Sequence, residues 1–107
     1  MKGIITMKSK TISTAATLDI YTIELMDNYL EISGVKTAMM MFNAMELYKV
    51  AGYRFELYEI VDGQVKRFRA FEETVQDVYE MAKQREVTNS IIWNQIIRDY
   101  VICKLYR

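Results

Sequence analysis

The chain has 107 residues, 51% of them hydrophobic and 26% charged, which is typical of one globular domain and excludes an intrinsically disordered chain. Because it has no histidine and one cysteine, a single chain has no Ser-His-Asp or Cys-His catalytic site and no zinc-finger site, and we expect no metal or cofactor. Its 14 basic and 14 acidic side chains balance, which argues against duplex nucleic acid as the main partner. The sequence contains no run of about 18 apolar residues, the length needed to span a membrane.

The first ten residues differ from the rest of the chain. Residues 1–10 are short, basic and aperiodic, which predicts a flexible leader, with an edge strand through Ile4 and Ile5 as the alternative. They lack the long apolar region of a signal peptide, so the expected location is the cytoplasm. Residues 11–107 are expected to form a single domain.

Residues 11–33 are predicted to form a first β-hairpin. β-Branched residues dominate the first half of this segment and favour a strand, and Asp27-Asn28 suits a two-residue turn. The hairpin would place Glu24 opposite Glu31, which is mildly repulsive. The alternative is a helix with one stripe formed by Leu18, Thr22, Leu25 and Tyr29.

Residues 36–51 are predicted to form a helix. Alanine, methionine, glutamate, leucine and lysine are good helix formers, and Gly52 is the residue type that ends helices. Three consecutive methionines, Met39, Met40 and Met41, cannot all face one side. We expect them mainly in the core, with a self-association surface as the alternative.

Residues 53–71 give the strongest local signal, a second hairpin around the turn Asp62-Gly63. A two-residue turn sets a register that joins acids to bases. The expected pairs are Glu59 with Lys66 and Glu56 with Arg69.

One face of this hairpin is the candidate partner-binding surface. Strand alternation predicts an apolar core face made of Tyr53, Phe55, Leu57, Phe68 and Ala70. The opposite face carries the candidate binding residues Arg54, Tyr58, Arg67 and Arg69. Arginine and tyrosine are enriched in protein-binding hot spots, but the same face could stack bases and bind phosphates. A solvated face with no partner is the third interpretation.

The rest of the chain reads as two helices. Residues 72–86 begin with acidic and end with basic side chains, and residues 91–106 follow with apolar positions at helical spacing; a strand from residue 100 onward is the alternative. The apolar residues of the last helix occupy nearly its whole circumference, so we expect the helix either to be buried on several sides or to lie in a homodimer interface. Its candidate residues are Ile92, Trp93, Ile96 and Tyr100. We expect Cys103 to be an inert structural thiol.

Together these elements predict an α+β fold in the order ββ-α-ββ-α-α, with an antiparallel sheet of about four strands, from two hairpins, and two or three helices. The expected function is a small non-catalytic protein-binding module, an adaptor, regulator or inhibitor of a larger cytoplasmic protein. The bias toward isoleucine, lysine, tyrosine and asparagine suggests an origin in a phage or mobile element. A nucleic-acid-binding protein is the first alternative, and a small histidine-free enzyme is the second.

Overall fold

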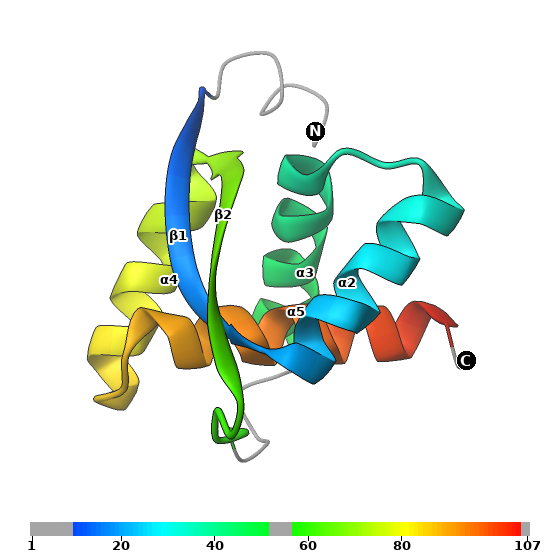
Figure 1. The fold of residues 1–107 in the computed structure, drawn as a ribbon. Coiled ribbons are helices and arrows are strands. Elements are labelled where there is room, and N and C mark those ends of the chain that lie inside the picture. The colour runs from blue at the N-terminus through cyan, green and yellow to red at the C-terminus, as the bar shows by residue number, and fades with distance from the viewer. Residues whose placement is uncertain (1–9, 52–56, 106–107) are drawn as a thin grey trace.

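The computed structural model describes residues 10–51 and 57–105 of the chain (Figure 1). Within these ranges, two strands and four helices follow one another in the order β-α-α-β-α-α. The elements are β1 (Thr11–Asp19), α2 (Ile20–Ser33), α3 (Thr37–Ala51), β2 (Gly63–Phe71), α4 (Glu72–Arg85) and α5 (Asn89–Leu105).

The sheet consists of β1 and β2 in antiparallel pairing. Thr11 lies opposite Phe71 and Asp19 opposite Gly63, with no interruption between them. Directly opposed residues share a face of an antiparallel sheet, so the sheet has one inner and one outer face. The inner face buries Ala16, Leu18, Phe68 and Ala70. The outer face exposes Ser13, Ala15, Val65, Arg67 and Arg69.

Helix α5 is the centre of the core. It contacts β1, α2, α3 and α4, and Figure 1 shows it crossing the molecule with the other elements arranged around it. Trp93 meets Phe68 edge to face, with the ring centroids 5.0 Å apart. Because elements of the same chain surround α5, its apolar circumference is buried without a second copy.

The predicted first hairpin is half right. Residues 11–19 form a strand as expected, but residues 20–33 form α2, which was the alternative. The helix buries Leu25 and Met26 in the core and avoids the apposition of Glu24 with Glu31 that the hairpin required. It ends at Gly34, whose positive φ of 72° lets its N–H bond to the carbonyl of Leu30 at 2.9 Å.

The predicted second hairpin is wrong, because β2 pairs with β1 instead of with the segment before it. Lys66 lies opposite Ala16 and Arg69 opposite Ser13, so the expected pair of Glu59 with Lys66 is absent from the ladder. Residues 53–56 lie outside the described ranges, and they include Arg54 and Glu56. The α and β composition agrees with the prediction, but the described sheet has two strands and not four.

Residues 57–61 do not pair with β2, because side chains of other elements accept hydrogen bonds from their backbone. The backbone N–H of Tyr58 donates to Oε1 of Gln95 at 2.8 Å, and that of Val61 donates to Oδ2 of Asp19 at 3.2 Å. Gly63 serves close packing here, since a Cβ atom at this position would lie 2.6 Å from Cγ2 of Thr17. Gly63 is therefore the first residue of a strand that packs tightly on β1, and the Asp-Gly pair does not form the turn of a hairpin.

The other helices confirm their predictions. Residues 37–51, 72–85 and 89–105 are helical, and the last of these continues as a helix to residue 105. Met40 and Met41 are buried and Met39 is half-buried, in agreement with the core interpretation. Across the described ranges, no helix is both long and apolar enough to cross a membrane.

Candidate protein-binding surface

The structure keeps two of the four candidate binding residues together. Arg67 and Arg69 are both exposed on the outer face of β2, on either side of the buried Phe68. Tyr58 lies against α5, and Arg54 is outside the described residues. The predicted alternation of exposed and buried side chains along β2 is thus confirmed, whereas Tyr58 is separated from the two arginines.

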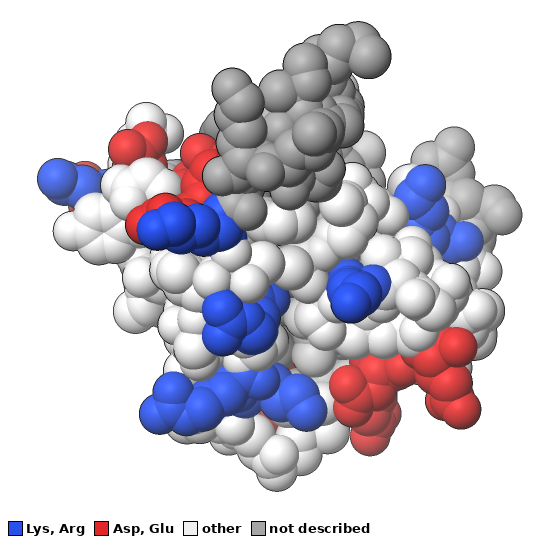
Figure 2. Space-filling view, turned by 90° about the horizontal axis from the view of Figure 1, so that it is seen from above, with Lys and Arg blue, Asp and Glu red and all other residues white. Residues whose placement is uncertain are grey.

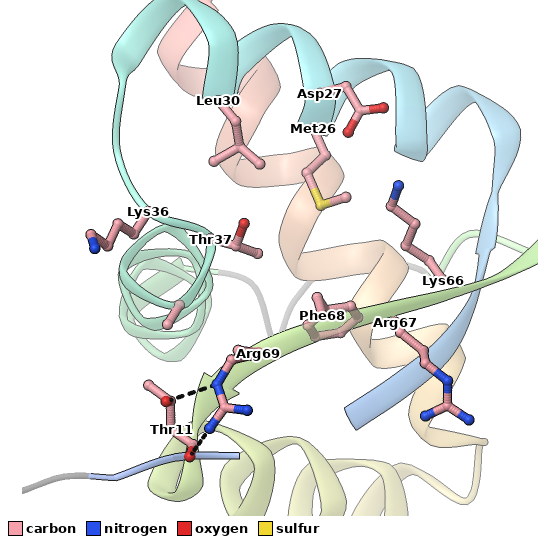
Figure 3. Close-up of a pocket in the computed structure, with 11 residues that line it drawn as sticks. Thr11, Met26, Asp27, Leu30, Lys36, Thr37, Lys66, Arg67, Phe68 and Arg69 are labelled. Carbon is pink, nitrogen blue, oxygen red and sulfur yellow. Dashed lines mark hydrogen bonds between the residues drawn. The ribbon is translucent and has the colours of Figure 1, made fainter. Parts of the chain in front are cut away.

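The two arginines differ in their contacts. Arg69 is held by β1: its Nε donates to Oγ1 of Thr11 at 3.1 Å and its Nη2 to the Thr11 carbonyl at 2.7 Å (Figure 3). The side chain of Arg67 makes no hydrogen bond or ion pair with any other described residue. Arg67 is therefore the charge of this pair that is available to a partner.

Tyr58 belongs to a cluster on α5. The guanidinium carbon of Arg98 lies 4.0 Å from the ring centroid of Tyr58 and 4.8 Å from that of Tyr21. The Tyr58 hydroxyl donates to Oδ1 of Asp99 at 3.3 Å. Burial raises the pKa of Tyr58, and the negative charge of Asp99 raises it further, while Arg98 opposes the change. These contacts fasten the segment before β2 to α5.

A groove of about 680 Å³ lies beside β2, between this strand, α2 and the start of α3 (Figure 3). Residues 66–69 of β2 form one side of the groove. Successive strand side chains point to opposite faces, so a wall made of four consecutive residues is an edge of the strand. The other sides include Met26, Asp27 and Leu30 of α2, and Lys36, Thr37 and Ala38 at the start of α3.

The pairing of β1 and β2 shows which backbone groups face this groove. The pattern continues past both ends of the ladder: the N–H of Ile20 donates to the carbonyl of Asp62 at 2.9 Å, and that of Glu72 to Lys10 at 2.8 Å. Hydrogen-bonded pairs alternate with non-bonded pairs, so the even-numbered residues of β2 bond to β1. The odd-numbered ones direct their N–H and C=O groups to the free edge. In the interior of β2 these are Val65, Arg67 and Arg69, and Gly63 and Phe71 are the odd-numbered residues at its two ends.

The charge around the groove is mainly positive. Its lining includes Lys36, Lys66, Arg67 and Arg69 against one acid, Asp27. Figure 3 shows that Lys66 extends from β2 toward α2, whereas Arg67 and Arg69 point to the other side of the strand. In Figure 2, basic side chains spread across the middle of the end at which β1 begins, and acidic ones lie toward two margins.

Sequence reasoning found the basic stretch of β2 but missed the groove. It assigned Lys66 to an ion pair with Glu59 on a neighbouring strand, and it placed neither α2 nor α3 beside β2. It also gave no role to Lys36 or to Arg98. The cluster of basic residues at 66–69 was the available signal; the position of α2 and α3 beside the strand was not visible in the pattern.

The four candidate self-association residues are all buried within one chain. Ile92 and Ile96 have no exposed surface, and Trp93 has 2%. The Tyr100 hydroxyl lies 3.2 Å from that of Tyr29 on α2. Self-association stays a prediction, and it would need a different surface.

Neither the arrangement of metal-ligating side chains nor the comparison with known proteins identifies a further site. In the part of the chain that the structure describes, no group of three Cys, Asp or Glu side chains is placed to hold a metal ion. The chain matches no protein-family model, no curated protein and no solved structure. The surface chemistry of β2 is therefore the basis for assigning a function.

Proposed function

We propose that this chain is a small protein-binding module that acts as an adaptor, regulator or inhibitor of a larger protein. Its contact surface is the outer face of β2 together with the adjoining free edge. The observation that supports this proposal most directly is an unpaired strand edge that lines a groove and carries Arg67, a charge without a partner among the described residues. Exposed strand edges are sites at which proteins add a further strand from another chain.

Nucleic acid is the second candidate, because Arg67 and Lys66 could contact phosphates. Two features favour protein over nucleic acid. The net charge is zero, so the long-range attraction for a polyanion is weak. The free edge also offers the backbone N–H and C=O groups of Val65, Arg67 and Arg69, with which an extended peptide can pair as a strand and a phosphate backbone cannot.

Capture from an extract of the source cells tests the function. Tagged full-length chain is compared with Arg67→Glu after nuclease treatment, and bound proteins are identified by mass spectrometry. We expect a protein that the unchanged chain retains and Arg67→Glu loses. Lys83→Glu is the matched control, because Lys83 is an exposed base on α4.

Three results would contradict the proposal. The first is capture that nuclease abolishes, which would favour the nucleic-acid alternative. The second is a captured protein that Arg67→Glu and Lys83→Glu retain or lose equally. The third is an extract in which no captured protein distinguishes the unchanged chain from Arg67→Glu.

A further inference from the structure

We infer that the partner presents an extended acidic segment, which binds along the free edge of β2 as an added antiparallel or parallel strand. This inference rests on the proposed protein-binding function and specifies its binding mode. It combines three observations: the outward backbone groups of β2, the groove beside them and the excess of basic side chains around that groove.

The backbone of β2 provides the hydrogen-bonding template. Val65, Arg67 and Arg69 direct their N–H and C=O groups away from β1, as the alternation of the ladder requires. No hydrogen bond joins these backbone groups to another described residue. An added strand can occupy them at every second residue, which gives affinity without depending on the partner's side chains.

The side chains near the edge select the sequence of the added strand. A partner residue opposite Arg67 shares its outer face, so an acidic residue is favoured there. Its neighbours in the partner point toward the groove, where Met26, Leu30 and Phe68 offer apolar contacts. Lys66 extends into the same space and suits an acid at the groove margin (Figure 3). The expected segment therefore alternates acidic and apolar residues.

Charge disfavours two other occupants of this edge. A second copy that paired its own β2 here would bring Lys66, Arg67 and Arg69 close to the same basic residues, which is repulsive. Residues 1–9 of this chain include Lys2 and Lys8 and no acidic residue, so they lack the complementary charge. An acidic segment from a different protein is the occupant that complements the edge.

A capped seven-residue peptide of alternating glutamate and valine, labelled with a fluorophore, is the probe. Its binding to the full-length chain is measured by fluorescence anisotropy. Two matched forms are N-methylated on one or the other alternate set of amides, which removes hydrogen bonds on a single edge of the peptide. We expect one set to weaken binding at least about tenfold and the other to be tolerated. A lysine–valine peptide should bind at least about tenfold more weakly than the glutamate peptide.

Changes in β2 test the same geometry from the protein side. Arg67→Pro and Arg67→Ala both remove the charge, but only proline removes the outward N–H. We expect Arg67→Pro to bind the peptide about tenfold more weakly than Arg67→Ala. Amide hydrogen exchange should show that the peptide slows exchange at Arg67 and Arg69, while Lys66 and Phe68 are slow already in the free chain.

Several outcomes would overturn strand addition. One is equal binding of the two N-methylated peptides. Another is binding of the lysine–valine peptide, or of an oligodeoxynucleotide with the charge of the glutamate–valine peptide, that is as tight as binding of the glutamate–valine peptide itself. Slow exchange of Arg67 in the free chain would show that the chain or a second copy already covers the edge. The two proposals remain separable: if Arg67-dependent capture of a cellular protein succeeds while the peptide tests fail, the function stands and the binding mode falls.

Discussion

The two edges of the sheet differ in whether their outward backbone groups have hydrogen-bond partners. Along β1, the outward N–H groups of Thr17 and Asp19 donate to side chains of α5, to Oγ of Ser90 at 2.9 Å and to Oδ1 of Asn94 at 2.8 Å. The Nδ2 group of Asn94 also donates to the carbonyl of Thr17 at 3.0 Å. Along β2, the outward groups face a groove and have no such acceptor or donor among the described residues.

This difference explains how a two-stranded sheet can be both stable and open. An isolated pair of strands is marginal in water, so one edge and one face are fixed to the helices. The other edge stays accessible, and its basic side chains oppose pairing with an identical edge. Under the proposed binding mode, the same charges would disfavour an identical edge and favour an acidic partner.

The largest expected effect comes from proline in β2. Lys66→Pro removes an N–H from the ladder with β1 and should lower the free energy of unfolding by about 3 kcal/mol or more. Val65→Pro removes an N–H that points to the free edge, at a residue that is 73% exposed, and should cost about 1 kcal/mol or less. Urea unfolding measures both. Similar losses for the two variants would show that the assignment of bonded and free residues in β2 is wrong.

The next effect comes from the edge that α5 covers. Asn94→Ala removes the buried acceptor of the Asp19 N–H and the donor to the Thr17 carbonyl, and we expect a loss of about 2–4 kcal/mol. Ser90→Ala removes the acceptor of the part-buried Thr17 N–H and should cost about 1 kcal/mol. Thermal unfolding measures the loss of stability in both variants. A smaller loss for Asn94→Ala than for Ser90→Ala would contradict this prediction.

Smaller effects separate the two arginines of the outer face. Arg69→Ala removes two hydrogen bonds to Thr11 at an exposed position, which should cost about 0.5–1 kcal/mol. Arg67→Ala removes no contact within the described chain and should change stability by less than about 0.5 kcal/mol. Denaturant midpoints of the two variants test this order. The reverse order would mean that Arg67 supports the fold and is not free for a partner.

The smallest expected effect concerns Tyr58, which holds residues 57–61 on α5 and away from β2. Its pKa is raised by burial and by Asp99, so the folded chain keeps this proton to higher pH than the unfolded chain does. The stabilisation is complete below about pH 10 and is lost as the pH rises through the folded pKa. Tyr58→Phe should reduce the alkaline loss of stability, measured by urea unfolding between pH 8 and pH 11. An unchanged slope would contradict this role.

The sequence predicted local structure better than strand partnership. Residues 37–51 and the two last helices follow from helical spacing, and the alternation of Arg67, Phe68 and Arg69 follows from strand periodicity. The pairing of β2 with β1 could not be predicted in this way, because the Asp62-Gly63 pair is a strong local signal for a hairpin turn. It is outweighed by contacts far apart in the chain, such as Val61 with Asp19 and Tyr58 with Gln95.

The candidate site shows the same division. Arg67 and Arg69 were identified from composition and alternation, but the groove beside them depends on α3 packing against β2 and on α2 packing against α5. Residues 20–33 were predicted to complete a hairpin, with a helical stripe as the alternative, and the structure buries Thr22 and Leu25 of that stripe in α2. Helical spacing could therefore indicate α2, but the contacts that place α3 beside β2 join segments distant in the sequence and have no local pattern.

The central position of α5 has a consequence for how the chain folds during its synthesis. This helix follows every element that packs on it, and Asn94 bonds to residues more than 70 positions earlier. On a ribosome, β1 and the first helices must therefore wait, with their apolar faces exposed, until residues 89–105 emerge. We therefore expect contacts between β1 and α5, which are far apart in the sequence, to slow folding.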